Sequence, residues 1–275
     1  MNTTFLKRIL EVKRRSVESA KSRADIGQLR ELAAATRSGS SVRRLSAALS
    51  RTDRVNIIAE FKRASPSKGD ININIDVAEA ARAYQNGGAC AISVLTEAQF
   101  FKGSLDDLRN VREVAELPIL RKDFIIDEFQ IYESAAAGAD AILLIVAALT
   151  GENLEAFHKT AIGLGLDALV EVHDLEELKF AQSIGATLIG VNNRNLHTFK
   201  VSLDVSRELI TNKTDGCTMI SESGLSSSDE IIELKNLGFD GFLIGETLMR
   251  SGNAETELRM LATERTEFTE TEFAS

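Results

Sequence analysis

Short apolar runs alternate with amphipathic stretches along most of the chain. Eight runs, the first beginning at Val55, consist mainly of aliphatic residues and lie between polar or glycine-containing segments, as buried strands do. We expect strands over residues 55–61, 89–95, 117–121, 140–146, 167–172, 187–191, 217–221 and 240–244. The intervening stretches have helical spacing of apolar positions, which predicts helices over residues 76–87, 104–115, 127–138, 150–164, 174–185, 202–212, 226–237 and 254–263.

Cap residues support this alternation. Asp174 and Ser226 stand where N-caps belong. Near-continuous apolar strands indicate a parallel sheet covered by helices, and eight strand–helix units in succession favour a single (β/α)8 TIM barrel. A doubly wound open sheet is the alternative, but it usually has fewer strands and a glycine-rich first turn, which this chain lacks. Glycines follow four of the helices at the position of a C′ residue: Gly138, Gly165, Gly185 and Gly238.

The segments outside the alternating region have a different character. Residues 4–35 have helical spacing without strand character and predict one or two helices, while residues 36–52 are basic and serine-rich and predict a linker with a short helix. We therefore expect a helical extension over residues 1–50 and the barrel over residues 51–262. Residues 263–275 are acidic and poor in aliphatic side chains, which predicts a frayed tail.

Composition narrows the class of protein. The chain has 275 residues, 44% hydrophobic and 27% charged, and its net charge of −9 argues against a nucleic-acid-binding surface. No apolar run approaches the roughly 18 residues of a membrane span, and the N-terminal residues lack the features of a signal peptide. Cys90 and Cys217 lie in apolar runs without metal-ligand spacing. We expect a cytoplasmic protein with no cofactor, metal, membrane or nucleic-acid partner; its oligomeric state is open, with a monomer favoured.

The first expected strand ends in charged residues. In IIAEFKRASPSKG, residues 57–69, Ile58, Glu60 and Lys62 share one face because strand side chains alternate. If the strand is central, both charges must be paired or must face a cleft, since burying either alone is costly. An edge strand with solvated charges accounts for these residues equally well.

Polar residues also end other strands, at the edge where barrels of this class carry their sites. One such residue alone is more often a solvated rim residue, but their joint occurrence at interior-facing positions favours a functional site. The residues are Lys122 on the face of Leu120, Glu171 on the face of Leu169, Asn192 and Arg194 on the face of Gly190, Glu222, Ser223 and Gly224 after the seventh strand, and Gly245 and Glu246 after the eighth. Arg121 has the opposite parity and is expected to face the helices or a salt bridge.

Two kinds of subsite are indicated. Gly224, Gly245 and Ser65 offer backbone N–H groups and a hydroxyl, as in the phosphate sites of these barrels. The other strand-end residues mix acids and bases, whose pKa values close contact would push apart. No metal-ligand pattern is present. Of the three histidines, His158 and His197 are expected at the surface, and His173 is given a minor place at the rim.

The sequence resembles the indole-3-glycerol phosphate synthase family from the N-terminal helix to about Arg250. The motifs that carry the resemblance are IIAEFKRASPSKG, FFKGS, LRKDFIID, EVHD, IGVNNRNL, SESG and FLIGETLM. Enzymes of this family close the ring of 1-(2-carboxyphenylamino)-1-deoxyribulose 5-phosphate with loss of CO2 and water. A phosphoribosylanthranilate isomerase is the sibling alternative, but it should show a Cys/Asp pair where this chain has Glu60 and Asn192. A non-catalytic phosphate-binding barrel should lose at least one of Lys62, Lys122 and Glu171, and none is lost.

The resemblance implies roles for the strand-end residues. Lys122 would be the general acid of ring closure, and Lys62 would hold the substrate carboxylate, although the division of duties between the two lysines stays open. Glu171 and Glu60 would transfer protons and stabilise a cationic intermediate. The implied catalytic residues are Glu60, Lys62, Lys122, Glu171, Asn192 and Ser223; Phe101, Leu143, Arg194 and Glu222 would bind substrate; Ser65, Gly224, Gly245 and Glu246 would bind phosphate, the last two through their backbones.

Overall fold

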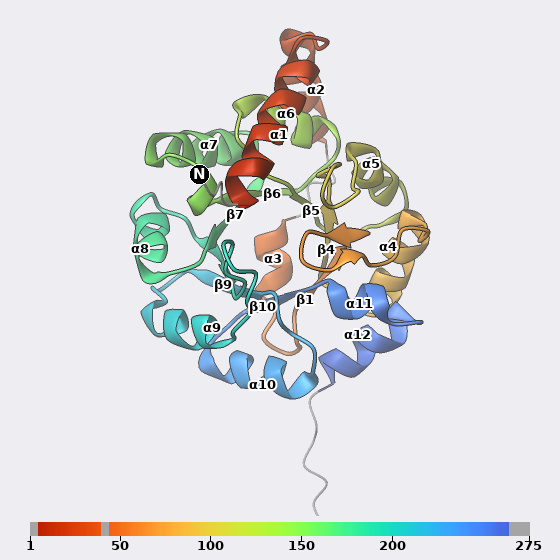
Figure 1. Ribbon diagram of the computed structural model, residues 1–275, viewed down its shortest axis with the longest axis vertical. Coiled ribbons are helices and arrows are strands. Elements are labelled where there is room, and N and C mark those ends of the chain that lie inside the picture. The colour runs from red at the N-terminus through yellow and green to blue at the C-terminus, as the bar shows by residue number, and fades with distance from the viewer. Residues whose placement is uncertain (1–4, 40–43, 264–275) are drawn as a thin grey trace, which may run out of the picture.

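Eight parallel strands close into a barrel in the computed structural model, which describes residues 5–39 and 44–263 (Figure 1). The order around the barrel is β1-β10-β9-β8-β7-β6-β5-β4, which confirms the predicted single (β/α)8 TIM barrel. Because β1 pairs with β4 and β10, the interpretation of an edge strand with solvated charges is wrong. The strands are β1 (Ile57–Phe61), β4 (Ala91–Leu95), β5 (Ile119–Lys122), β6 (Ala141–Ile145), β7 (Asp167–Val172), β8 (Leu188–Asn192), β9 (Thr218–Glu222) and β10 (Gly241–Ile244).

Helices cover the outside of the barrel and are fixed by their caps. The serine that caps α10 is Ser227, whose side chain accepts from Glu230 N, so the prediction of Ser226 as N-cap was wrong by one residue. The expected helix over 202–212 is shorter, because its last turn, Ile210–Asn212, is a 3-10 helix. The helices are α4 (Val77–Asn86), α5 (Leu105–Val114), α6 (Glu128–Ala136), α7 (Gly151–Gly163), α8 (Leu175–Ser183), α9 (Asp204–Leu209), α10 (Ser228–Leu237), α11 (Glu246–Arg250) and α12 (Ala254–Ala262).

The strands separate two apolar cores, as alternating side chains require. One core lies between strands and helices, and the smaller core fills the barrel interior. Ile58, Leu120 and Leu169 belong to the interior core, so the predicted parity of these three strands is confirmed. Polar residues replace the leucines toward the carboxyl ends of several strands, and this leaves room for a pocket at that end.

Three helices precede the barrel: α1 (Phe5–Lys21), α2 (Ile26–Ser38) and α3 (Leu45–Leu49). Helix α3 inserts Leu45 and Leu49 into the interior core at the amino ends of the strands. Helix α2 packs on α6, and Figure 1 shows α1 crossing in front of the barrel. A short hairpin, β2 (Ala64–Ser65) with β3 (Gly69–Asp70), follows β1. The acidic tail that is expected to fray covers residues 263–275, and from residue 264 onward it lies outside the described residues.

Candidate active site

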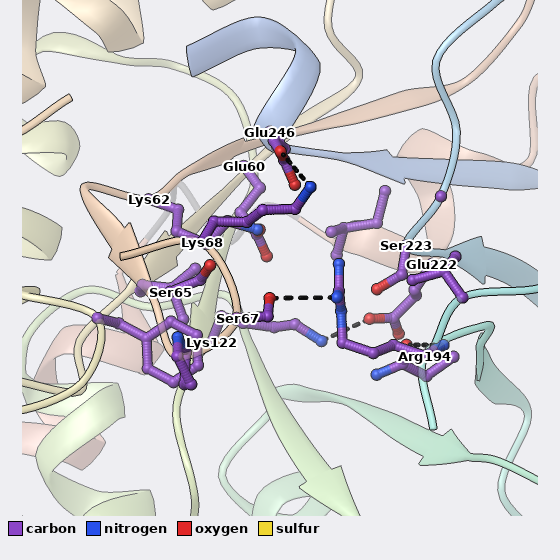
Figure 2. A pocket seen from close by; sticks show the side chains of 18 of the residues that line it. Glu60, Lys62, Ser65, Ser67, Lys68, Lys122, Arg194, Glu222, Ser223 and Glu246 are labelled. Atoms are coloured by element: carbon purple, nitrogen blue, oxygen red, sulfur yellow. Dashed lines mark hydrogen bonds and ion pairs between the residues drawn. The ribbon is translucent and has the colours of Figure 1, made fainter. Parts of the chain in front are cut away.

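One pocket of about 750 Å³ opens at the carboxyl ends of the strands (Figure 2). Every residue that the sequence singled out as a site residue lines it. These residues are Glu60, Lys62, Ser65, Phe101, Lys122, Leu143, Glu171, Asn192, Arg194, Glu222, Ser223, Gly224, Gly245 and Glu246. The structure thus brings all of these residues together in one pocket, while the part that each residue plays stays a prediction.

Strand order brings the charged residues together at the barrel axis. In the closed barrel β5 lies across from β9, and β1 lies across from β7. Lys122 on β5 therefore reaches Glu222 on β9, with Nζ 2.5 Å from Oε2, and it also meets Glu171 on β7 at 2.7 Å. Both carboxylates are almost fully buried, so the ammonium and the acids interact without water between them. Burial works against the Lys122 charge, but Glu171, Glu222 and Glu60 outweigh it and hold the pKa of Lys122 above its ordinary value.

The two carboxyl groups that share Lys122 differ in charge state. Burial raises the pKa of Glu222 to about 7, with the Glu171 charge acting in the same direction. Burial also works against ionised Glu171, but Lys122 and His173 together hold the pKa of Glu171 below its ordinary value. Glu171 is thus the ionised partner of Lys122, and Glu222 gains and loses a proton near neutrality. Two groups with such separated pKa values can hold an acid and a base in one site.

His173 causes this asymmetry, and sequence reasoning gave it too little weight. Its Nε2 lies 3.3 Å from Glu171 Oε1, and its Nδ1 lies 3.0 Å from Glu177 Oε2 at the first turn of α8. Burial works against the imidazolium, but the two carboxylates raise the pKa of His173 to about 10. None of the three histidines is among the residues that line the pocket, and His173 acts on it through Glu171. His158 is half-buried and His197 is exposed, which partly fits their predicted surface positions.

The raised pKa of Glu222 predicts a pH dependence of stability. A carboxyl group that keeps its proton in the fold up to about pH 7, but loses it near its ordinary value when unfolded, destabilises the fold as pH rises through that window. Glu222→Gln removes the titration, so the Tm of this variant relative to the unchanged protein should rise between pH 5 and pH 8. Thermal unfolding across this range measures the difference, with exposed Glu152→Gln as the control. A difference in Tm that stays constant or falls with pH would contradict the assignment.

Glu60 and Lys62 form a second ion pair, 2.7 Å apart, beside the first. Glu60 is buried, and its carboxylate fills the space next to Gly245. A Cβ at Gly245 would lie 2.5 Å from Glu60 Oε1, so glycine at this position makes room for the carboxylate. With Glu222 protonated, the pocket holds two ammonium–carboxylate pairs and no excess charge at its centre.

An apolar wall occupies the side of the pocket near β4, β5 and β6. It contains Phe101 and Leu143, which the sequence predicted, and Phe124, which it did not. The rings of Phe101 and Phe124 lie 6.4 Å apart. Helix α1 completes this wall with three residues of one face: Phe5, Leu6 and Ile9. No signal in the sequence marks these three beyond the apolar spacing of an ordinary amphipathic helix.

Backbone groups and small side chains occupy the side near β9, β10 and β1. Ser223 and Gly224 both have positive φ, 68° and 85°, which turns the chain sharply after β9. Gly245 is the N-cap of α11, and Ser65 in the hairpin faces the same space. Missed residues here include Ser67, Lys68 and Arg250. Lys68 Nζ lies 3.4 Å from Glu246 Oε1, and Arg194 donates to Ser67 Oγ at 3.3 Å, as Figure 2 shows.

Other kinds of site receive no support from the described part of the chain. Within residues 5–39 and 44–263, no three His, Cys, Asp or Glu side chains group as metal ligands would. The helices described in these ranges are all too short or too polar to cross a lipid bilayer. Cys90 and Cys217 are free and buried, as their apolar surroundings predicted.

Solved structures of similar fold are barrels that the chain matches at low identity. The thiamine phosphate pyrophosphorylase of Pyrococcus furiosus superposes with a TM-score of 0.56 at 18% identity, over 75% of this chain and 93% of that one. The KGPDC of Streptococcus mutans gives a TM-score of 0.57 at 16% identity, over 75% and 95% of the two chains. At such identity these likenesses show the fold alone.

Sequence relatives are much closer. The family model described as indole-3-glycerol phosphate synthase matches residues 6–261. The indole-3-glycerol phosphate synthase of Carboxydothermus hydrogenoformans is 45% identical over 261 residues, which cover 94% of this chain and 99% of that protein. The protein of the same name from Exiguobacterium sibiricum is 48% identical over 253 residues, 90% of this chain and 93% of its own. The family model thus spans both the pocket and the helix that lies across it, and the chain belongs to the indole-3-glycerol phosphate synthase family.

Proposed function

We propose that the chain converts 1-(2-carboxyphenylamino)-1-deoxyribulose 5-phosphate into indole-3-glycerol phosphate, CO2 and water, a step of tryptophan biosynthesis. One observation carries the proposal: the Lys122 ammonium lies between Glu171 and Glu222 at the barrel axis, with an apolar wall on one side and a backbone-lined end on the other. The substrate has the same arrangement, an aryl ring and a phosphate separated by the reacting ketone.

Ring closure needs an acid at the ketone oxygen. The aromatic carbon that bears the carboxylate attacks the ketone carbon, and the oxygen takes a proton as the carbon–carbon bond forms. Lys122 supplies this proton, because it is the cation at the centre of the pocket. The electron pair leaves the aromatic ring and its nitrogen, which becomes a cationic iminium. Glu171, held ionised by its two cationic neighbours, stabilises this positive charge. Because Glu171 is buried, little water weakens the attraction.

Loss of CO2 then returns the carbon–carbon bonding pair to the ring and neutralises the iminium. Lys62 pairs with Glu60 beside the Lys122 cluster, and we assign it to the substrate carboxylate. Dehydration removes the hydroxyl as water with the help of an acid, and a carboxylate takes the proton from the neighbouring carbon to form the last double bond. Glu171 is the ionised carboxylate available to this proton, and Glu222, with its pKa of about 7, is suited both to take up a proton and to return one to the site.

The remaining residues position the substrate. Phe101 and Leu143 contact the aryl ring, and Asn192, Arg194 and Ser223 lie beside the ribulose carbons. The phosphate lies at the carboxyl ends of β9 and β10, where N–H groups of Gly224, Gly245 and Glu246 are available with the Ser65 hydroxyl. Backbone donors of this kind bind phosphates in many barrels, and they do so without a cofactor.

The phosphate assignment predicts a kinetic effect at Gly245. In Gly245→Val the added side chain blocks approach of the phosphate and displaces Glu60, since a Cβ there would lie 2.5 Å from Glu60 Oε1. We expect KM to rise by at least about tenfold, and kcat to fall too, because a displacement of about 1 Å can cost about 10²-fold. Steady-state kinetics measure both. Gly252→Val is the matched control, since space beside Gly252 is open; an unchanged KM in folded Gly245→Val would remove the subsite.

We propose further that the protein acts as a cytoplasmic monomer with no nucleic-acid partner. The residues proposed for catalysis and binding lie together in a single copy of the chain, so the proposed mechanism needs no residue from a second copy. The net charge of −9 opposes binding to nucleic acid. Light scattering of the purified protein measures its mass in solution and so tests the monomer. The proposed cytoplasmic location is supported by the proposed substrate, which is a small, soluble phosphate ester.

A direct assay tests the proposed reaction. The purified protein is mixed with the synthetic substrate, and indole formation is followed by its absorbance and fluorescence, with CO2 measured in parallel. Equal amounts of indole-3-glycerol phosphate and CO2 are expected. Isomerisation of phosphoribosylanthranilate, tested in the same way, would instead support the sibling enzyme, and binding of the substrate without turnover would support the non-catalytic barrel.

A further inference from the structure

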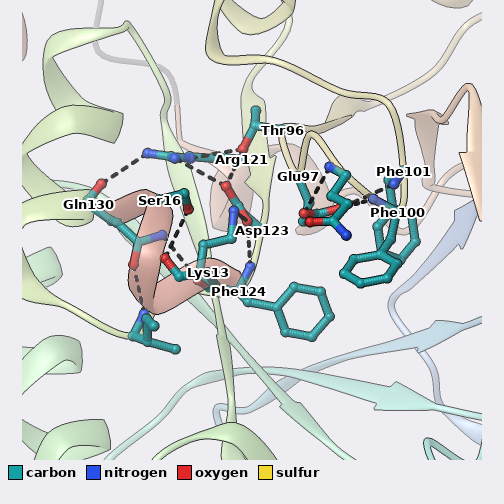
Figure 3. A network of polar contacts seen from close by, with 12 residues as sticks. Lys13, Ser16, Thr96, Glu97, Phe100, Phe101, Arg121, Asp123, Phe124 and Gln130 are labelled. Atoms are coloured by element: carbon teal, nitrogen blue, oxygen red, sulfur yellow. Dashed lines mark hydrogen bonds and ion pairs between the residues drawn. The ribbon is translucent and has the colours of Figure 1, made fainter. Parts of the chain in front are cut away.

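Asp123, the residue after Lys122, is the centre of a buried polar network outside the reacting groups (Figure 3). Its Oδ1 accepts from the Phe124 backbone N–H at 2.8 Å and lies 2.5 Å from Lys13 Nζ. Its Oδ2 accepts from Thr96 at 2.7 Å and from Arg121 at 3.1 Å. Both oxygens are thus fully occupied, and a buried carboxylate with so many donors is a fixed point of the structure.

Lys13 belongs to α1, and its contact with Asp123 crosses from this helix to the barrel. The Lys13 side chain is only 8% exposed and that of Asp123 is 0% exposed, so the pair is buried at the interface. Ile9 lies one turn before Lys13 on the same face of the helix, and Leu6 and Phe5 lie one turn further. All three line the apolar wall of the pocket. The ion pair therefore fixes the helix face that forms part of this wall.

The barrel side of the pair fixes the other part of the wall. Phe124, held through its N–H by Asp123, contacts the pocket and lies beside Phe101. The carboxylate of Glu97, the residue after Thr96, accepts from the N–H groups of Phe100 and Phe101 at 2.6 and 3.2 Å. Phe100 in turn packs edge-on against Phe5 of α1, with ring centroids 5.2 Å apart. Helix, loop and strand end thus meet around one aromatic group.

We propose that Lys13 and Asp123 form a positioning pair that holds α1 and Phe124 in place as the wall against the substrate's aryl ring. Asp123 also lines the pocket. Its two carboxylate oxygens are occupied by Lys13, Phe124, Thr96 and Arg121, and Lys122 pairs instead with Glu171 and Glu222, so we assign the pair to positioning and not to the reacting centre. Its loss should loosen the wall and so weaken binding of the substrate and of the transition state by the same amount. Such a loss of uniform binding raises KM and leaves kcat nearly unchanged.

The chain offers a matched control in Arg37. This residue also belongs to the N-terminal helices, is buried, and pairs with a buried barrel aspartate, Asp140, at 3.0 Å. The contact lies at the amino end of β6, and neither residue lines the pocket. Arg37→Met should therefore lower stability as Lys13→Met does, because each breaks one buried ion pair of the extension. Of the two variants, only Lys13→Met should weaken binding of the substrate.

The test compares the full-length protein with Lys13→Met, Arg37→Met, Asp123→Asn and the double variant Lys13→Met/Asp123→Asn. For Lys13→Met we expect KM to rise by about tenfold or more with kcat within about threefold, and for Arg37→Met a lower Tm with unchanged KM. Lys13→Arg, which keeps the cation, should restore most of the affinity. The effects of the two single changes on KM should not multiply in the double variant, because one contact carries both.

Hydrogen exchange gives a readout that does not depend on turnover. Amides of residues 6–13 and 99–101 and of Phe124 should exchange faster in Lys13→Met than in Arg37→Met. The inference rests on the proposed function, and an inactive parent protein would remove that function while this arm still decides whether the pair holds the wall. Unchanged KM in folded Lys13→Met, an equal rise in Arg37→Met, or unchanged exchange would each overturn the proposal. If Lys13→Met fails to fold, Asp123→Asn with its nearly identical shape answers the same question.

Discussion

Replacing Lys122 with methionine should lower kcat by about 10²–10⁴-fold, the usual effect of losing a positioned general acid. Methionine keeps an apolar stem of similar length and removes the ammonium group, which is both the proton donor and the cation between the two carboxyl groups. Lys122 forms ion pairs with both Glu171 and Glu222, at 2.7 and 2.5 Å, and in the proposed mechanism it is the proton donor to the ketone oxygen. Steady-state kinetics, with binding of substrate measured separately, check the prediction.

The Lys122→Met fold should survive although two buried carboxyl groups lose their common cation. Glu171 keeps the charge of His173, whose Nε2 lies 3.3 Å away. Glu222 already has a pKa of about 7 and can stay protonated without its cation. Loss of activity can therefore be separated from loss of structure. A lower Tm is expected, so the kinetics of the two proteins should be compared at a temperature well below this Tm.

The choice of control for Lys122→Met depends on contacts that strand parity alone does not reveal. Arg121 faces the helices, as its parity predicted, but it is buried and bonds to Glu133 and Asp123. Arg121→Met would thus disturb the network that holds Phe124, and it is no neutral comparison. Exposed Lys159 on α7 is the better one, and Lys159→Met should leave kcat unchanged. Parent-like kcat in Lys122→Met would show that another group supplies the proton.

Strand parity explains why so much of the site could be predicted. A parallel barrel sends alternate side chains of every strand inward and places all carboxyl ends at one edge. Glu60, Lys122 and Glu171 could therefore be placed together without knowledge of any long-range contact. The apolar runs fixed the strands to within two residues at most boundaries, because few other structures bury such short segments on both faces.

Contacts between distant elements could not be predicted in this way. Phe5 and Ile9 read as one stripe of an amphipathic helix, and nothing local tells whether that stripe faces a pocket or a solid core. The Lys13–Asp123 pair joins residues 110 positions apart, and neither has a neighbour in sequence that marks it. His173 presents a related difficulty. Its importance comes from two carboxylates, Glu171 in β7 and Glu177 in α8, and the sequence does not show that the imidazole lies between them.

The charge states of these residues are even harder to predict from the sequence than their contacts. Glu171 on β7 and Glu222 on β9 both lie near the carboxyl ends of their strands, and both accept a hydrogen bond from the same lysine, Lys122. His173, which lowers the pKa of Glu171, and the Glu60 charge, which raises the pKa of Glu222, separate the two carboxyl groups. A sequence predicts that such a cluster exists, but the order of its pKa values depends on distances that are set by the closed barrel.

Gly190 offers a test of how tightly this cluster is packed. It lies in β8 next to the strand that carries Glu222, and a Cβ placed on it would lie 2.0 Å from Glu222 Oε1 and 3.3 Å from Leu169 Cδ1. The backbone of Gly190 does not have positive φ, so glycine is needed there for space and not for conformation. Gly190→Ala must therefore push away the Glu222 carboxyl group, which is one of the two partners of Lys122.

We expect Gly190→Ala to lower kcat by about 10²-fold, because displacements of about 1 Å at a reacting centre cost that much. Gly163→Ala at the end of α7 is the control, since nothing lies within 4 Å of its Cβ position, and it should leave kcat unchanged. If the effect acts through Glu222, then adding Gly190→Ala to Glu222→Ala should cost little more activity, because the clashing atoms are gone. Full additivity of the two changes, or parent-like kcat in Gly190→Ala, would mean that the position of the Glu222 carboxyl group does not limit catalysis.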